Sequence, residues 1–229
     1  MNQESLFYIA TFGVILIIKT NIMKRVSLFL VAVAFAMSSV TANAQLKGSE
    51  VVFNSFEVTY SPTTLKVIFL EFDINSVSAD WAQVRALPLG YPLYLQYGAG
   101  LQYSAGEYGL LVGQKVKFLS AKVPVNVMYS LDLPNTNFTV MPYAGLNFRF
   151  NILGLNESDD SKTNMLNKDD MDGEPLNRFV LGWQIGAKVS YDRYLLGIGY
   201  EGPVTNLSND EYGNKMTVSY VNISLGIKF

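Results

Sequence analysis

The side chains of this chain that could do chemistry are acids, bases, amides and hydroxyls, because histidine and cysteine are both absent from its 229 residues. Without histidine, the chain has no base of the kind that activates a serine nucleophile in hydrolases. Without histidine or cysteine, it lacks the usual zinc ligands and cannot form a disulfide. We therefore expect no catalytic residues, no cofactor and no metal site, and a protein that is not an enzyme.

Charged and amide side chains recur at alternate positions among apolar ones, and eight of them form a candidate polar network. They are Glu57, Gln96, Gln102, Lys122, Arg149, Gln184, Lys188 and Glu201. Successive side chains of a β-strand point to opposite faces, so residues in one phase share a face. Acids and bases that share an enclosed face can pair with one another, and the same charges could also line a conducting path.

The most distinctive polar segment is residues 153–177, which is rich in acids. Within it, Asp170-Met171-Asp172-Gly173 is similar to the start of a calcium loop, but Pro175 interrupts and the downstream glutamate of an EF-hand is missing. One hypothesis is a divalent cation that bridges this segment to lipopolysaccharide phosphates. The composition favours the other hypothesis, a solvated and partly disordered acidic loop.

A second motif, Gly197-Ile198-Gly199-Tyr200-Glu201-Gly202, has the spacing of a dinucleotide-binding loop. That loop needs a helix directly after it. Here the glycines lie in an alternating segment and Pro203 follows, so the motif does not meet the structural condition and we expect no nucleotide site.

Strict alternation of apolar and polar residues predicts that these side chains are carried by β-strands. Six segments alternate clearly: residues 92–104, 119–131, 138–152, 179–191, 196–201 and 221–229. Residues 55–60 and 72–87 are less regular. In the latter, Phe72 and Ile74 fall in the phase opposite to Val77, Ala79 and Trp81, which predicts a β-bulge near Asn75 or Ser76. The total is eight strands.

The connections between these segments alternate in length. Short turns are expected at residues 87–91, 132–137 and 192–193, and longer connections at 105–114, 153–177 and 202–215. Alternating short and long connections are typical of up-and-down membrane barrels. The sequence therefore predicts an all-β fold, an eight-stranded antiparallel up-and-down transmembrane β-barrel with both ends on the periplasmic side.

The polar phase is predicted to face the barrel interior. It holds the charged residues of the strands and many glycines, which weaken a solvent-facing strand but make room inside a crowded bore. A charge facing the lipid midplane would cost about 2–4 kcal/mol. Lys115 and Lys117 take the apolar phase, so we expect them on a strand extension above the bilayer or beyond a bulge. A soluble carrier with an apolar cavity is the opposite arrangement of the same pattern.

Aromatic residues gather towards the ends of the strands, as in the interfacial girdles of membrane barrels. On the side of the short turns they are Tyr91, Tyr94, Tyr129, Phe138, Tyr191, Tyr194 and Phe229. On the side of the long loops they are Tyr60, Tyr103, Tyr108, Phe150, Phe179 and Tyr200.

The first 44 residues have the pattern of a cleavable signal peptide. Lys24 and Arg25 precede an apolar run over residues 26–37, and Ala42-Asn43-Ala44 follows as a cleavage site, so the mature barrel domain is expected to span residues 45–229. Met23 is the expected true start, which means that residues 1–22 result from a start codon assigned too early. A longer leader or a membrane anchor is the alternative.

The stretches at residues 93–103 and 142–150 and the closing Ile223-Ser224-Leu225-Gly226-Ile227-Lys228-Phe229 resemble the outer-membrane protein β-barrel domain family, which is similar to the small OmpA/OmpX-type barrels and PorT-like proteins. The resemblance implies location in the outer membrane of a Gram-negative cell. It also implies that Phe229 is an assembly signal read by the barrel-assembly machinery.

From the residues and this resemblance we expect a structural or surface-interaction role through the long outer loops. A narrow pore for ions or small solutes is the alternative. The expected partners are outer-membrane lipid and lipopolysaccharide. The formal net charge of −2 with no basic stripe indicates no nucleic-acid partner. A closed barrel has no free edge for pairing, so a monomer is expected.

Overall fold

The computed structural model describes residues 50–67, 70–89, 91–107, 115–158, 161–168, 175–209 and 215–229. The compact unit that contains the barrel spans Ser49–Phe229. The signal peptide predicted over residues 1–44 lies outside the described residues and stays a prediction. No helix in the described part of the chain is long and apolar enough to cross a membrane.

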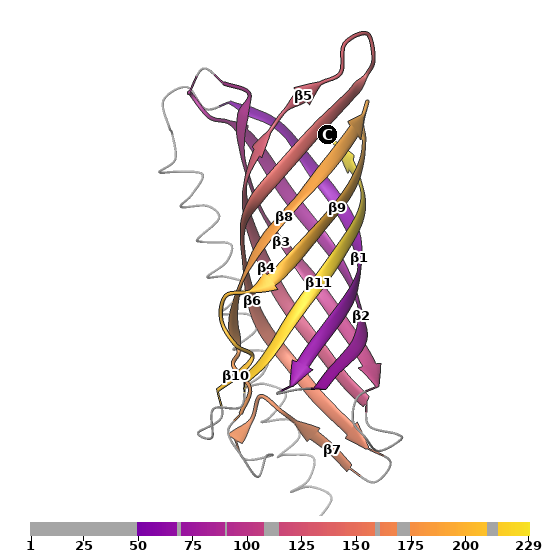
Figure 1. Ribbon diagram of the computed structural model, residues 1–229, viewed down its shortest axis with the longest axis vertical. Coiled ribbons are helices and arrows are strands. Elements are labelled where there is room, and N and C mark those ends of the chain that lie inside the picture. The colour runs from indigo at the N-terminus through magenta and orange to yellow at the C-terminus, as the bar shows by residue number, and fades with distance from the viewer. Residues whose placement is uncertain are drawn as a thin grey trace, which may run out of the picture. The chain divides into compact units, whose positions relative to one another are not determined.

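Eight long strands form the wall of the structure (Figure 1). They are β1 (Val51–Val67), β2 (Leu70–Ala86), β3 (Leu93–Glu107), β4 (Lys115–Tyr129), β6 (Phe138–Ser158), β8 (Phe179–Tyr191), β9 (Tyr194–Pro203) and β11 (Lys215–Lys228). Three short strands, β5 (Leu131–Asp132), β7 (Ser161–Asn164) and β10 (Ser208–Asn209), extend the connections.

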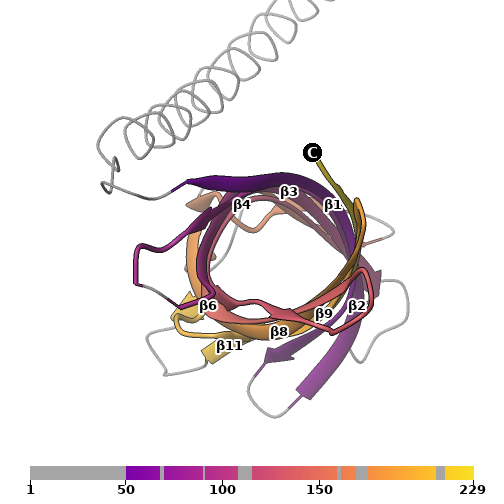
Figure 2. The same ribbon diagram turned by 90° about the horizontal axis from the view of Figure 1, so that it is seen from above.

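Each long strand pairs antiparallel with its neighbour in sequence, and β11 pairs with β1 to close the ring (Figure 2). Closure satisfies the backbone groups of both edge strands, so no sheet edge is left open among the long strands. The predicted eight-stranded antiparallel up-and-down barrel is confirmed.

The stagger of the strands can be followed through hydrogen-bonded partners once round the ring. The path runs Phe53, Val84, Gln96, Asn126, Gly145, Gln184, Glu201, Tyr220 and Thr63. It returns to β1 ten residues beyond its start, which is a shear of ten for eight strands. With strand spacings of about 4.8 Å and a rise of about 3.3 Å per residue, this stagger tilts the strands by roughly 40°.

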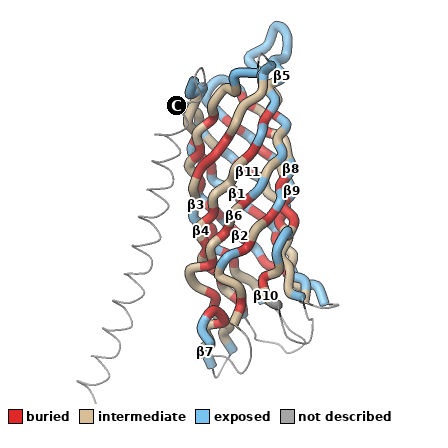
Figure 3. Tube along the Cα trace, turned by 90° about the vertical axis from the view of Figure 1, so that its left-hand side faces the viewer, coloured by how far each residue is buried: buried red, intermediate tan, exposed pale blue. Residues whose placement is uncertain are grey.

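Along the strands, buried and exposed residues alternate (Figure 3). The apolar phase faces outward: Leu225 is 66 % exposed and Trp183 is 42 % exposed. Leu95 and Val125 lie half-buried on the same outward face. The predicted polar-inside arrangement is therefore correct in the middle of the barrel, and an inward-facing apolar cavity of the carrier type is not formed there.

The bulge predicted in the second strand is wrong. The register between β1 and β2 runs without a shift from Val67↔Leu70 to Phe53↔Val84. Ile74 simply faces inward and is 2 % exposed. The prediction failed because it assumed that inward residues are polar along the whole strand, whereas the interior becomes apolar near one end.

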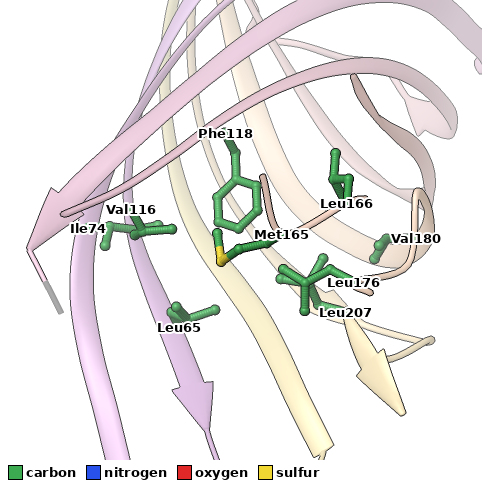
Figure 4. Close-up of a cluster of buried hydrophobic side chains, with 9 residues drawn as sticks. All are labelled: Leu65, Ile74, Val116, Phe118, Met165, Leu166, Leu176, Val180 and Leu207. Atoms are coloured by element: carbon green, nitrogen blue, oxygen red, sulfur yellow. The ribbon is translucent and has the colours of Figure 1, made fainter. Parts of the chain in front are cut away.

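Two apolar layers lie inside the barrel, one near each end. At the end with the long connections (the long-loop end), inward residues of the strands pack with residues of the connections (Figure 4): Leu65, Ile74, Val116, Phe118, Met165, Leu166, Leu176, Val180 and Leu207. At the end with the tight turns (the short-turn end), the layer consists of Val84, Met128, Met141 and Leu195. The polar interior lies between these two layers.

The described parts of segment 153–177, residues 153–158, 161–168 and 175–177, have more structure than the solvated loop that the composition favoured. Strand β6 continues to Ser158, and β7 folds back to pair with it. Met165, Leu166 and Leu176 are then buried in the long-loop layer. The calcium-like stretch Asp170-Met171-Asp172-Gly173 lies outside the described residues, so the cation hypothesis stays untested.

Lys115 and Lys117 lie on the outward face of β4 at the long-loop end, as the strand-extension alternative predicted. Lys115 pairs with Glu107 at 3.7 Å, and Lys117 forms an ion pair with Glu157. A register shift does occur next to them, because Ile152 of β6 has no partner between Leu119↔Leu153 and Ser120↔Asn151.

Most of the predicted girdle aromatics face outward, including Tyr60, Tyr103, Tyr191 and Phe229. Tyr94 does not, because it packs inward against the short-turn layer. Its phase is that of Gln96, which also faces inward. Tyr108 lies outside the described residues.

Candidate functional site

The middle of the bore holds the eight polar residues singled out from the sequence. All of them face inward and each is less than a tenth exposed: Glu57, Gln96, Gln102, Lys122, Arg149, Gln184, Lys188 and Glu201. They come from six strands, β1, β3, β4, β6, β8 and β9. The alternation of each strand puts them inside, and the closed ring brings them within contact of one another.

The most deeply buried ion pair joins Arg149 of β6 to Glu201 of β9 at 2.8 Å, with side chains 4 % and 3 % exposed. Glu201 also accepts a hydrogen bond from Asn147 at 2.8 Å, and Arg149 donates to Gln102 at 3.2 Å. The guanidinium lies 4.1 Å from the ring centre of Tyr220. These contacts compensate both charges in a site with little access to water.

A second ion pair spans the junction between β11 and β1, where the ring of strands closes. Lys188 of β8 donates to Glu57 of β1 at 2.5 Å, and Ser55 donates to the same carboxylate at 3.1 Å. The Lys188 ammonium lies 5.8 Å from the ring centre of Tyr143. This pair therefore links the first strand to the sixth long strand of the ring.

The third pair joins Lys122 of β4 to Asp80 of β2 at 3.0 Å. Asp80 also accepts a hydrogen bond from Ser78 at 2.8 Å. Gln184 donates to Asn126 at 2.7 Å, and Asn126 donates to Gln96 at 3.0 Å, so amides connect the space between the ion pairs.

Sequence reasoning missed several members of this network: Asp80, Asn126, Tyr143, Asn147 and Tyr220. The signal for Asp80 was available, because it alternates with Ala79 and Trp81, which were assigned to the outward phase. Tyr143 and Tyr220 were not included, because the predicted network was drawn from charged and amide side chains alone.

The side chain of Tyr143 occupies space that neighbouring glycines leave free. Its hydroxyl lies so close to Gly186 and Gly199 that a Cβ at either position would overlap it. Gly199 belongs to the Gly197-to-Gly202 motif, which lies in β9, so the motif serves packing against a tyrosine in the bore.

The bore is filled rather than open. Between the Glu57–Lys188 and Asp80–Lys122 pairs lies a cavity of about 60 Å³, and beside Arg149 one of about 20 Å³. A cavity of 60 Å³ has room for only a few waters. A larger pocket, of about 190 Å³, lies at the short-turn end over Met128 and Met141.

The arrangement can hold charge in fixed pairs, and within the described ranges it does not present a nucleophile beside a free base. No group of three or more acidic side chains in those ranges could hold a metal ion. The ion pairs and amide contacts join strands β1, β2, β3, β4, β6, β8 and β9 across the inside of the barrel.

No protein-family model matches the chain, and none of the curated proteins compared with it matches. Solved structures with a similar fold exist. Neisserial surface protein A is 12 % identical with a TM-score of 0.46, and the match covers 77 % of this chain and 97 % of that one.

Two further structures have the same TM-score of 0.46. They are the attachment invasion locus protein Ail of Yersinia pestis, solved with the heparin analogue sucrose octasulfate (11 % identity, 79 % and 99 % coverage), and a major outer membrane protein of Thermus thermophilus (14 % identity, 77 % and 99 % coverage). At such identities the likeness concerns the fold alone.

Proposed function

We propose that this chain is an integral β-barrel of the outer membrane, non-enzymatic, with a structural or surface-interaction role carried by its long-loop end. The observation that supports this is an uninterrupted outward apolar band around a closed barrel. Between Arg85 at one end and Lys66, Asp73 and Lys117 at the other, the outward positions of the described strands hold no charged side chain.

The height of the band matches a bilayer. On β4 it runs from Tyr129 to Leu119, eleven residues separated by ten steps on a strand tilted by roughly 40°, which is about 25 Å. Lipid-facing bands of outer-membrane barrels are about 25 Å tall. Leu196, Ile198 and Leu225 are each more than half exposed within it. A water-soluble protein rarely exposes a continuous apolar surface of this extent.

The long-loop end offers the surface for interaction. There β6 and β7 extend past the band, and Glu157 of β6 bridges Lys117 of β4 and Lys162 of β7. We assign the long-loop end to the cell exterior. The short-turn end, where the first and last strands of the barrel begin and finish, is assigned to the periplasm. Outer-membrane lipid and lipopolysaccharide are the proposed surroundings, and Phe229, which is 67 % exposed, is the proposed signal to the assembly machinery.

The alternative, a narrow pore, has less support. A conducting path would have to cross the apolar layers at both ends and the paired charges between them. Planar-bilayer recordings of the refolded protein are expected to show no steady open-channel conductance. A steady open state would favour the pore.

Membrane fractionation tests the proposal directly. Expressed in a Gram-negative host, the protein should remain in the outer-membrane fraction after a carbonate wash and should migrate faster in gels when it is not boiled. Recovery of the folded protein in the soluble fraction without detergent would overturn the proposal.

A further inference from the structure

A row of polar side chains crosses the outward surface at the short-turn edge of the apolar band. Asn54, Gln83 and Tyr97 are partners in register across β1, β2 and β3. Their side chains occupy the phase that elsewhere faces outward with apolar residues. The next outward row towards the band contains Phe56 and Trp81, which are also partners in register.

Hydrogen bonds hold this row together and end on an arginine. Gln83 Nε2 donates to Asn54 Oδ1 at 3.1 Å. Gln83 Oε1 accepts from the Tyr97 hydroxyl and, at 3.0 Å, from Arg85 Nε. Tyr97 is only 8 % exposed, so the row is packed against the barrel wall. The Arg85 guanidinium is therefore fixed through one of its nitrogens.

The two terminal nitrogens of Arg85 are left to bind something else. Within the described ranges, no carboxylate lies within ion-pair distance of Arg85, and its one side-chain hydrogen bond is the one to Gln83. A guanidinium has five donors in a planar fork that matches the oxygens of a phosphate. An arginine held by Nε presents that fork in a fixed direction.

We propose that Arg85, oriented by Gln83, binds the phosphate of a phospholipid in the leaflet at the short-turn end. This inference rests on the proposed membrane function. A lipid is favoured over free phosphate because Arg85 lies at the edge of the apolar band, where Phe56 and Trp81 can contact the acyl chains while the guanidinium holds the headgroup. Phe56 is 45 % exposed, which leaves it available to the lipid.

Lipid retention by the purified barrel tests the inference. The protein in detergent is mixed with dioleoyl phosphatidylglycerol, and bound lipid is counted by native mass spectrometry. Dioleoylglycerol, which lacks the phosphate, measures binding through the acyl chains alone. R85Q should retain about tenfold less phosphatidylglycerol than wild type, the factor that corresponds to about 1.4 kcal/mol. R193Q, at an exposed arginine of the turn at the same end, is the matched control and should stay within about twofold.

Q83L keeps the charge of Arg85 but removes its support, and it should give a smaller loss than R85Q. If R85Q does not fold, Q83L decides the test. Unchanged retention in the folded R85Q or Q83L barrel overturns the inference, and so does an equal loss in R193Q, which would indicate unspecific charge attraction. Displacement by millimolar inorganic phosphate would show that the site binds the anion without the lipid. Membrane insertion of R85Q, measured by fractionation, separates failure of this inference from failure of the proposed function.

Discussion

Replacement of Glu201 by glutamine should destabilise the barrel more than the same replacement of a solvent-exposed glutamate such as Glu71. Glutamine keeps the shape of Glu201 but leaves the Arg149 guanidinium buried without its counter-charge. Both side chains are almost completely buried, and they lie 2.8 Å apart. Removal of one partner of such a buried pair typically costs about 3–5 kcal/mol, because the remaining charge is desolvated and uncompensated.

The remaining contacts of Arg149 decide how much smaller than this the loss in the free energy of unfolding can be. Gln102 still accepts from Arg149, and the ring of Tyr220 still lies 4.1 Å away, so part of the charge stays compensated. We therefore expect a loss near about 3 kcal/mol in the free energy of unfolding. The double variant R149M/E201L removes both charges and should lose less than E201Q alone.

Urea unfolding in lipid vesicles, followed by the loss of heat-modifiable gel mobility, gives the free energies. E71Q is the control, because the Lys66–Glu71 pair is more than half exposed and should contribute less than about 1 kcal/mol. A loss below about 1 kcal/mol for E201Q would refute the reasoning, since it would mean that water reaches the pair and screens it.

Three other variants test the remaining features. L225K places a charge in the middle of the outward band and should cost about 2–4 kcal/mol in vesicles, whereas T64K beyond the band should cost about 1 kcal/mol or less; equal costs in the unfolding assay would argue against a lipid-facing band. G199A forces a methyl group against the Tyr143 hydroxyl and should cost about 1–3 kcal/mol, and Y143F should restore part of that stability in the double variant. The hydrogen bonds from Lys117 and Lys162 lower the pKa of Glu157 to about 2. This carboxylate therefore stabilises the fold above its ordinary pKa, and the contribution is lost as the pH falls from about 4.5 to 2. The difference in unfolding midpoint between wild type and E157Q should shrink over that pH range, and a constant difference would contradict the ion-pair assignment.

The sequence predicted most of the wall of the barrel, because alternation is a local property. In β4, for example, the outward Val123, Val125 and Val127 and the inward Lys122 and Asn126 follow from a period of two alone. The orientation of the faces also followed, because glycines and charges share a phase.

What the sequence did not predict depends on distant segments. Ile74 faces inward because Met165 and Leu207 from other connections complete an apolar layer over it, and no local pattern encodes that meeting. The choice of partners, such as Lys188 for Glu57, depends on the shear of the closed ring, which is a property of all eight registers together. The support of Arg85 by Gln83 was likewise not predicted, because only Lys115 and Lys117 were recognised as polar residues in the outward phase.

The pairing of Lys188 with Glu57 has a consequence for biogenesis. These residues lie on opposite sides of the junction between β11 and β1, and 131 positions of the chain separate them. Until β11 pairs with β1, each of these two side chains must remain hydrated or enter the hydrocarbon core as an unpaired charge. Insertion into the bilayer and closure of the ring are therefore coupled into one cooperative event. An open sheet does not enter the lipid, because its unpaired charges would lose their hydration there.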